Sequence, residues 1–375
     1  MTTGWIWHEK FGWHDTGTAA GFFKGIPGAQ PYHHYESAES KTRFASLVEA
    51  SDFDQHLTRL QPRQATIAEI AAVHDETHIK RMDELSRTEA GGDMGDGSSP
   101  FGPGGFEIAK LAAGAAVVAM DAVVSGQVEN AYALVRPPGH HAERASGMGF
   151  CMFANIAIGI QATREKFNLE RIAVVDWDVH HGNGTESIFK DDPGVLTISL
   201  HQDGNYPRDS GGLDQVGVGS AVGTILNVPL PPGSGNGAYE YAFEAVVEPA
   251  LRRFAPDLIV VACGFDAALA DPLAAMMLTS STYRKLTSKL KHLAQELCRG
   301  RLVMVHEGGY SPVYVPFCGL ATLEALSGED SGITDPFEED WAAWPGQDLQ
   351  PHQQAVVDRA GQILPTVPLR DTEQE

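Results

Sequence analysis

The sequence holds only four cysteines in 375 residues, and none of them forms a CxxC pair. They are Cys151, Cys263, Cys298 and Cys318. Neither a disulfide framework nor a cysteine-based zinc site is therefore expected. A reducing compartment fits this pattern, and we predict that the protein is cytoplasmic.

Long apolar segments are also missing. The longest candidate, residues 111–124, is rich in alanine and contains Asp121, so it is too short and too polar to span a bilayer. Residues 1–10 contain no apolar core of the kind that a signal peptide needs. We therefore expect neither a membrane segment nor a signal peptide.

Positive charge is scarce. The 27 lysines and arginines stand against 49 aspartates and glutamates, which gives a formal net charge of −22. Nucleic acids and anionic membranes both require a positive surface on the protein that binds them. The charge balance therefore argues against both kinds of partner, and it is compatible with a cationic substrate such as a lysine-bearing peptide.

What the sequence does contain is an alternation of strand and helix patterns. Short β-branched runs predict strands, and longer periodic runs predict helices. The alternation predicts an α/β fold with helices on both faces of a central, mostly parallel sheet. The predicted strands are 5–8, 131–135, 171–176, 195–200, 258–263 and 302–306, and the predicted helices are 37–50, 67–73, 106–124, 155–167, 239–254 and 281–298.

The predicted domain organisation is a single unit over residues 1–375. Its catalytic core spans about 35–325, and an aromatic, glycine-rich loop occupies residues 1–35. An acidic, proline-rich tail with little regular structure follows over about 329–375. Residues 91–100 are rich in glycine and serine, which predicts a mobile loop.

One stretch, residues 174–185, organises the candidate chemistry. It starts as a buried strand and then places Asp176, Asp178 and His180 two residues apart. Alternate residues of an extended segment point to the same side, so these three groups share a face. Because converging carboxylates are costly without a positive partner, a divalent cation is the simplest explanation. Asp178 and His180 suit a zinc-like ion with Asp176 behind them; the alternative is an acidic loop with scattered histidines.

Polar groups also follow other predicted strands. His140 and His141 come just after strand 131–135, Asp266 after strand 258–263, and Tyr310 after strand 302–306. Ligands of parallel sheets bind outside the carboxyl ends of the strands. Four separate segments therefore bring polar groups to one edge of the predicted sheet.

These stretches carry a family resemblance. The motifs RPPGHH (136–141), GFC (149–151), DWDVHHGNGT (176–185), SLH (199–201), GFDA (264–267), DPL (271–273) and EGGY (307–310) occur in the order seen in the arginase/deacetylase superfamily. Over about residues 35–325 the chain resembles a bacterial histone-deacetylase-like amidohydrolase, closest to class II deacetylases. The resemblance implies the three-layer α/β/α arginase/deacetylase fold, with the active site at the C-terminal ends of the strands.

The resemblance implies one catalytic Zn²⁺ per chain, bound by Asp178, His180 and Asp266. Two anionic oxygens and one neutral nitrogen balance the charge of the ion and leave coordination positions open. Tyr310 would donate a hydrogen bond to the oxyanion that develops during amide hydrolysis.

The resemblance further implies that His140 and His141 act as a general acid–base pair. Asp176 would brace His140, and Asn183 would brace His141. Class II relatives carry asparagine at this last position, where class I relatives carry aspartate. Since asparagine cannot stabilise an imidazolium by charge, we expect His141 to be the better base.

The expected substrate site is also carried over from the family. Phe150 and Tyr206 match the two aromatic walls around an acyl-lysine stem, although Tyr206 departs from the usual phenylalanine. Leu273 matches a gate position at which acetylpolyamine-specific relatives carry glutamate, so a peptide-type or promiscuous substrate is expected. The other predicted substrate-binding residues are Gly149, Gly308 and Ser98; a simple turn role for Ser98 stays open.

The family also binds one or two K⁺ ions through oxygen atoms near the zinc. The matching positions are Asp176, Asp178, His180, Ser199 and Leu200 for one site and Phe189, Asp192 and Val195 for a second. Backbone carbonyl ligands leave little mark on side-chain identity, so this expectation rests on the resemblance alone.

The expected function is zinc-dependent removal of acetyl or other acyl groups from the side-chain amide of lysine. An acetylpolyamine amidohydrolase, an arginase-like ureohydrolase and a catalytically weak acyl-lysine binder are the alternatives. Acyl-lysine peptides or small acylated amines are the expected substrates, hydroxamates the expected inhibitors and a homo-oligomer the expected assembly.

Overall fold

The sheet at the centre of the molecule has eight strands. The computed structural model describes residues 2–19, 21–22 and 27–370. Within them the strand order is β10-β9-β8-β11-β12-β7-β1-β4, and every neighbouring pair is parallel. The strands are β1 (Thr3–Ile6), β4 (Leu57–Arg59), β7 (Asn130–Ala133), β8 (Ile172–Asp176), β9 (Val195–Gln202), β10 (Ile225–Leu230), β11 (Leu258–Cys263) and β12 (Leu302–His306).

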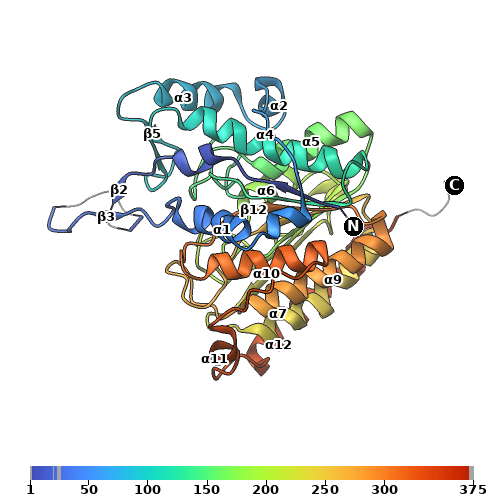
Figure 1. The fold of residues 1–375 in the computed structure, drawn as a ribbon. Coiled ribbons are helices and arrows are strands. Elements are labelled where there is room, and N and C mark those ends of the chain that lie inside the picture. The colour runs from blue at the N-terminus through green and yellow to red at the C-terminus, as the bar shows by residue number, and fades with distance from the viewer. Residues whose placement is uncertain (1, 20, 23–26, 371–375) are drawn as a thin grey trace.

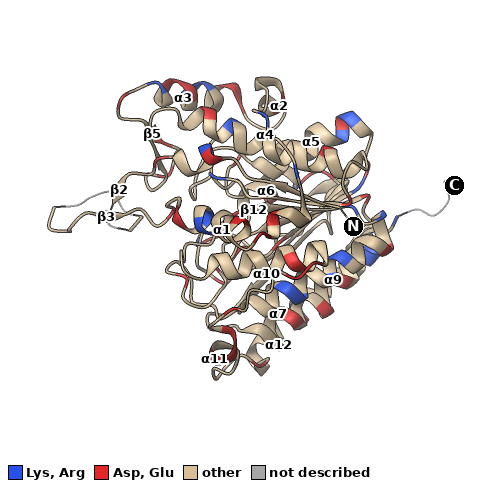
Figure 2. Ribbon diagram, in the orientation of Figure 1, with Lys and Arg blue, Asp and Glu red and all other residues tan. Residues whose placement is uncertain are grey.

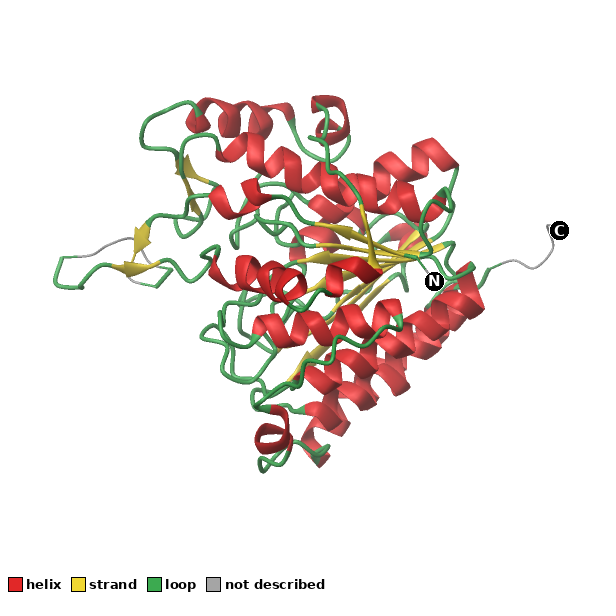
Figure 3. Ribbon diagram, viewed as in Figure 1, coloured by secondary structure: helices red, strands yellow, loops and turns green. Residues whose placement is uncertain are grey.

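Helices cover both faces of this sheet, which confirms the predicted three-layer α/β/α architecture (Figures 1 and 3). Helix α4 (Gly105–Val124) packs against α5 (Asn155–Phe167) on one face, and α9 (Ser280–Cys298) packs against α10 (Val315–Ser327) on the other. The remaining helices are α1 (Glu39–Ala50), α2 (Ile67–Ala71), α3 (Glu76–Ser86), α6 (Asn183–Phe189), α7 (Asn236–Ala242), α8 (Glu248–Phe254), α11 (Glu338–Ala342) and α12 (Pro351–Ala360).

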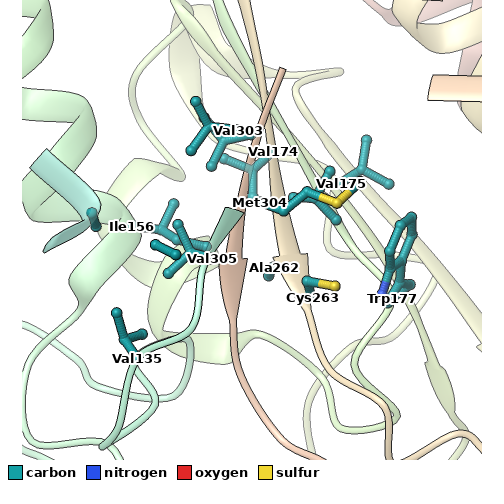
Figure 4. Close-up of a cluster of buried hydrophobic side chains, with 14 of the residues drawn as sticks. Val135, Ile156, Val174, Val175, Trp177, Ala262, Cys263, Val303, Met304 and Val305 are labelled. Carbon is teal, nitrogen blue, oxygen red and sulfur yellow. The ribbon is translucent and has the colours of Figure 1, made fainter. Parts of the chain in front are cut away.

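The central strands β8, β11 and β12 are almost wholly aliphatic, as strands that are covered on both faces must be. Figure 4 shows Val175, Met304 and Val305 packed around their middle, with Trp177 just beyond the end of β8. These side chains are excluded from solvent. The strand ends that follow are therefore fixed by a dense core.

In Figure 2 the red and blue segments are spread over the outer helices, such as α3, α5 and α9, and over loops. On α9, for example, Lys285 pairs with Glu240, and Lys289 pairs with Glu244 and Glu248. Exposed pairs of this kind contribute little to stability. In the described part of the chain no helix is both long enough and apolar enough to cross a membrane.

Several predicted boundaries were wrong. The first strand covers Thr3–Ile6 instead of 5–8, because Thr3 and Gly4 already pair with β7. The tail from 329 is not irregular: it contains α11 and α12, and α12 buries Val357 against the body. Residues 236–254 form one continuous helical segment that passes through a π-helical stretch, Phe243–Val247.

The two glycine-rich segments that were predicted as loops are partly ordered as small hairpins. Strands β5 (Gly92–Asp93) and β6 (Pro100–Phe101) bracket the segment that was expected to be mobile. Strands β2 (Thr18–Ala19) and β3 (Tyr32–His33) form a second hairpin that projects from the body (Figure 1). Part of the predicted aromatic loop, at residues 20 and 23–26, lies outside the described residues.

Candidate active site

The polar residues gather where four neighbouring strands end. Strand β8 ends at Asp176, and the turn after it carries Asp178 and His180. Strands β11 and β12 lead into the turns that carry Asp266 and Tyr310. Because β8, β11, β12 and β7 are adjacent and parallel, these turns meet at one edge of the sheet.

Asp178, His180 and Asp266 form a compact buried group. Nδ1 of His180 lies 3.1 Å from Oδ1 of Asp178 and 3.1 Å from Oδ2 of Asp266. The candidate ligand atoms all lie within 4.8 Å of one another. Burial and the negative charge of Asp178 raise the pKa of Asp266 to about 6. Two oxygen donors and one imidazole nitrogen around a common point fit a zinc-like divalent cation.

Backbone amides hold the two carboxylates of this group. The amide of Gly308 donates to Oδ2 of Asp178 over 2.7 Å, and the amide of Val179 donates to Oδ1 of Asp266 over 2.8 Å. A Cβ atom at Gly308 would lie 2.0 Å from Oδ2 of Asp266, so only glycine fits there. The structure therefore sets Gly308, which we expected to contact substrate, directly against the carboxylates.

His140 lies among negative charges. Its Nδ1 is 3.0 Å from Oδ2 of Asp176, and its Nε2 is 3.7 Å from Oδ1 of Asp178. Burial alone would lower the pKa of His140, but the charges of Asp178 and Asp176 outweigh it and raise the pKa well above the usual value. Oε2 of Glu307 accepts hydrogen bonds from the amides of Gly139 and His140, which fixes the backbone here.

His141 has the opposite surroundings. Its Nδ1 lies 2.8 Å from Oδ1 of Asn183, whose Nδ2 donates to Oε1 of Glu143 over 2.9 Å. This second bond turns the oxygen of Asn183 towards His141, so Nδ1 of His141 carries the hydrogen and Nε2 is left with a lone pair. Burial, followed by the nearby His140 and His180, lowers the pKa of His141 well below its usual value.

Tyr310 is held by its backbone and by helix α1. The amide of Tyr310 donates to Oδ2 of Asp271 over 2.8 Å. Ser40 Oγ and Lys41 Nζ both donate to the carbonyl of Gly309, over 2.8 and 3.1 Å. The buried ammonium of Lys41 also lies 5.0 Å from the centre of the Tyr310 ring. The turn that carries the phenol is therefore fixed on both sides.

A cavity of about 330 Å³ opens above these groups. Its floor includes His141, His180 and Tyr310, and its walls include Phe150 and Tyr206. Other residues that line it are Phe22, Ser98, Gly149, Asn205, Arg208 and Leu273. Every predicted substrate-binding residue except Gly308 therefore borders the cavity. Phe22 comes from the N-terminal aromatic segment, which therefore contributes to the lining of the cavity.

The residues of the expected K⁺ sites are also neighbours. Ser199 on β9 pairs directly with Asp176 on β8, and Leu200 follows it in the same strand. The second set lies in one turn, in which the amide of Asp192 donates to the carbonyl of Phe189 and the amide of Val195 donates to the carbonyl of Asp192. Potassium binding at both places stays a prediction.

Sequence reasoning missed several residues that support the site, among them Glu307, Asp271, Lys41 and Asp96. Glu307 and Asp271 lie inside the recognised motifs EGGY and DPL, so the motifs themselves were a usable signal. Lys41 lies in a helix and Asp96 in a glycine-rich loop, and neither position carries a local pattern that distinguishes it from a surface residue.

Comparisons with known proteins agree with this geometry. A family model described as a histone deacetylase domain matches residues 34–326. A histone deacetylase-like amidohydrolase from Pseudomonas aeruginosa is 48% identical over 306 residues, which cover 82% of this chain and 80% of the relative. Histone deacetylase 14 of Arabidopsis thaliana, a chloroplastic protein, is 38% identical over 80% of this chain and 75% of its own length.

A solved structure extends the match to nearly the whole chain. The crystal structure of the HDA15 HD domain superposes with a TM-score of 0.83 at 29% identity, and the match covers 97% of this chain and 96% of that one. The suspected resemblance is thus confirmed by both sequence and fold. The chain belongs to the histone deacetylase family, a family of amidohydrolases.

Proposed function

We propose that this protein hydrolyses the side-chain amide of acylated lysine in peptides or proteins, with one zinc-like ion per chain. The observation that carries the proposal is the buried Asp178–His180–Asp266 group, whose His180 lines the floor of an aromatic-walled cavity together with His141 and Tyr310. The names of the relatives, deacetylase and amidohydrolase, support the same reaction class.

Asp178, His180 and Asp266 would hold the ion, with Asp176 behind them. When bound, a divalent cation of this kind polarises a carbonyl and makes a water molecule more acidic. The chain contributes a buried, preorganised ligand set whose carboxylates are already oriented by backbone amides. We propose K⁺ as an additional cofactor at the carbonyl-rich positions around Ser199 and Leu200, with a second, structural K⁺ near Asp192.

His141 and His140 have different roles in proton transfer. Nε2 of His141 has a free lone pair and a lowered pKa, so it suits removal of a proton from the attacking water. His140 is kept protonated by Asp176 and Asp178, so it suits donation of a proton to the leaving amine of lysine. The attacking oxygen ends in the released carboxylic acid, and the lysine amine leaves with the transferred proton.

Tyr310 would donate its phenolic hydrogen to the oxyanion that forms on the amide carbonyl. Burial is the main cause that raises its pKa well above the usual value, so the hydroxyl stays protonated and available as a donor. Such a hydrogen bond lowers the barrier only because it strengthens as charge develops on the oxygen.

The walls of the cavity favour a lysine chain over a polyamine. Phe150 and Tyr206 offer apolar ring surfaces to the methylene groups of a lysine side chain. Leu273 borders the opening and supplies no carboxylate to pair with a second amine of the substrate. An acetylpolyamine amidohydrolase is therefore the second candidate, and a weak acyl-lysine binder ranks below both because Tyr310 and both histidines are present.

A substrate panel and a metal analysis test the proposal. Acetyl-, trifluoroacetyl- and longer acyl-lysine peptides are compared with N-acetylputrescine by kcat/KM, with and without a hydroxamate that we expect to inhibit. We expect peptide substrates to be preferred and about one tightly bound zinc-like ion per chain. Preference for N-acetylputrescine would favour the polyamine candidate, and two ions per chain would point to a ureohydrolase. Gel filtration tests the expected homo-oligomer.

A further inference from the structure

Asp96 links both walls of the cavity at its entrance. Its Oδ2 accepts a hydrogen bond from the hydroxyl of Tyr206 over 3.1 Å and one from the amide of Gly149 over 2.8 Å. Gly149 directly precedes Phe150, the opposite wall. One carboxylate therefore joins the two aromatic residues, although they come from separate loops.

The loop that carries Asp96 is itself well held. Oδ1 of Asp93 accepts hydrogen bonds from the amides of Gly95 and Gly97, over 2.9 and 2.8 Å. Ser99 Oγ donates to Oδ2 of Asp96 over 3.0 Å and accepts a hydrogen bond from the amide of Phe150 over 2.8 Å. The loop and Ser99 thus hold the carboxylate of Asp96 in position independently of its bonds to Tyr206 and Gly149.

The wall on the Phe150 side needs this support. Phe150 has a φ of +68°, a conformation that side-chain-bearing residues rarely adopt. Gly149 has a φ of +54°, and a Cβ there would lie 2.2 Å from the ring of His141. Strained residues persist only where the surroundings determine their conformation, and here Asp96 and Ser99 hold the two amides.

The wall on the other side is held at two points. The amide of His181, which follows the candidate metal ligand His180, donates to the carbonyl of Tyr206 over 3.1 Å. The hydroxyl of Tyr206 is the second point, and it exists only because tyrosine stands where family members usually carry phenylalanine. Burial alone would raise the pKa of Asp96, but hydrogen bonds from Gly149, Ser98 and Ser99 outweigh it and lower the pKa. The group that accepts the hydrogen bond from Tyr206 is therefore a carboxylate.

We propose that Asp96 is a positioning residue that fixes the width of the cavity entrance by tying the Tyr206 wall to the Phe150 wall, and so limits which acyl groups pass. This inference rests on the proposed function, since it concerns the selectivity of the same site. With the tie intact, acetyl-lysine passes and its stem fits closely between the rings. Without it, branched acyl groups such as isobutyryl gain access, and the stem is held less tightly.

The test compares Tyr206→Phe, Asp96→Asn and Asp96→Ala with the native protein on acetyl-lysine and isobutyryl-lysine peptides. The net contribution of a typical hydrogen bond corresponds to about a five-fold effect. We expect Tyr206→Phe to raise KM for the acetyl peptide about five-fold with little change in kcat, and to shift the kcat/KM ratio towards isobutyryl by about the same factor. Asp96→Ala should change KM and the kcat/KM ratio more than Tyr206→Phe does. Asp96→Asn keeps an acceptor oxygen and should change both quantities less than either of the other variants.

Tyr241→Phe is the matched control, because Tyr241 on α7 donates a similar hydrogen bond to Asp358 on α12, over 2.6 Å, and neither residue lines the cavity. It should leave both substrates unchanged. Tyr206→Phe and Asp96→Ala with native KM and native acyl preference would overturn the proposal. So would a kcat loss without a KM change, since that pattern belongs to the catalytic groups.

Amide hydrogen exchange separates this inference from the proposed function. Exchange at Gly149 should accelerate in Asp96→Ala and stay native in Tyr206→Phe, because only Asp96 accepts from that amide. This readout needs no turnover. If no acyl-lysine peptide is hydrolysed but Gly149 responds in this way, the proposed function fails while the Asp96–Gly149 half of the tie stands. Unchanged exchange at Gly149 in Asp96→Ala refutes the tie.

Discussion

The floor and the rim of the cavity are built in different ways. The groups at and directly beneath the floor, Asp176, Asp178, His180 and Asp266, are buried and lie at or just past the ends of neighbouring parallel strands. Backbone amides orient their carboxylates. The rim depends on loops, and the Asp96–Tyr206 hydrogen bond joins two side chains near solvent.

This difference indicates a division of labour. Reacting groups must be held within fractions of an ångström, and a packed sheet edge holds them more precisely than an exposed loop does. Loops on a rigid scaffold tolerate substitution, so selectivity can change there without loss of the chemistry. Changes at the floor should therefore act on kcat and on metal content, whereas changes at the rim should act on KM and on substrate preference.

The largest effect should come from Asp178→Ala. It removes one oxygen donor from the metal group and the hydrogen bonds that Asp178 accepts from His180 and Gly308. We therefore expect metal content to fall far below one ion per chain. Activity should drop by at least about 10³-fold, because a catalytic ion supplies several kcal/mol of transition-state stabilisation. Metal analysis and acyl-lysine hydrolysis are measured together, with Asp83→Ala, a partly exposed position on α3 that pairs with Arg87, as the control. Native metal content in Asp178→Ala would remove this residue from the ligand set.

Tyr310→Phe tests a floor residue that does not bind the metal. Loss of one oxyanion donor typically costs on the order of 10²–10³ in kcat. Metal content and hydroxamate affinity should remain close to native, since the ligands and the walls are unchanged. Near-native kcat on an acetyl-lysine peptide would show that the oxyanion is stabilised by another group.

The contrast between floor and rim also decides what sequence could predict. Asp176, Asp178 and His180 stand two residues apart behind a β-branched strand, so their shared face follows from local geometry. Asp96 meets Tyr206 only through tertiary structure, and its loop reads as a turn. Strand β10 and helix α3 were missed for a similar reason, since their patterns are short or interrupted by polar residues.

Lys41 is a second residue, this time in the core, whose role could not be predicted from the local sequence. It lies in α1 next to polar residues, yet it is buried against Glu36 and donates to the carbonyl that precedes Tyr310. Nothing in the helix pattern distinguishes it from an exposed lysine. A buried charge whose partners come from distant segments becomes recognisable only when those segments are placed together.

Lys41→Met therefore gives an intermediate effect at the floor. The Gly309 carbonyl keeps Ser40 as a donor but loses Lys41, so the Tyr310 turn should be held less firmly. We expect kcat to fall roughly ten-fold with little change in KM, which corresponds to about 1.4 kcal/mol. Steady-state kinetics with Lys80→Met, an exposed lysine, as the control give the comparison. A change confined to KM would place Lys41 with the rim.

Leu273→Glu tests the rim from the opposite direction. A carboxylate at the cavity opening should pair with the free amine of an acetylated polyamine and offer nothing to the stem of a peptide lysine. We expect the kcat/KM ratio of N-acetylputrescine to acetyl-lysine peptide to rise by about five-fold, the factor of one favourable exposed ion pair. An unchanged ratio would show that Leu273 does not govern substrate choice.

The smallest effect concerns a buried histidine outside the site. His140 at the floor is kept charged by carboxylates, whereas His74 has only backbone partners: its Nδ1 donates to the carbonyl of Glu143, and its Nε2 accepts from the amide of Ala154, both over 2.9 Å. A proton on Nε2 would break the second bond. Burial, followed by the charge of His78, lowers the pKa of His74 to about 3.

The sign of the pH effect follows from this direction. In the unfolded chain His74 titrates near its ordinary pKa of about 6.5, so between pH 7 and pH 6 the unfolded state takes up the proton while the folded state does not. Folding stability therefore falls as the pH falls, by about 0.7 kcal/mol for this residue over that interval.

Urea unfolding of His74→Gln, whose amide can donate and accept in the same places, should show a correspondingly smaller loss of folding stability between the two pH values. His352→Gln, at an exposed position, is the control and should lose as much as the native protein. The effect of pH on metal binding is common to all three proteins and cancels in the comparison, so equal losses in His74→Gln and the native protein would mean that His74 carries a proton in the folded state.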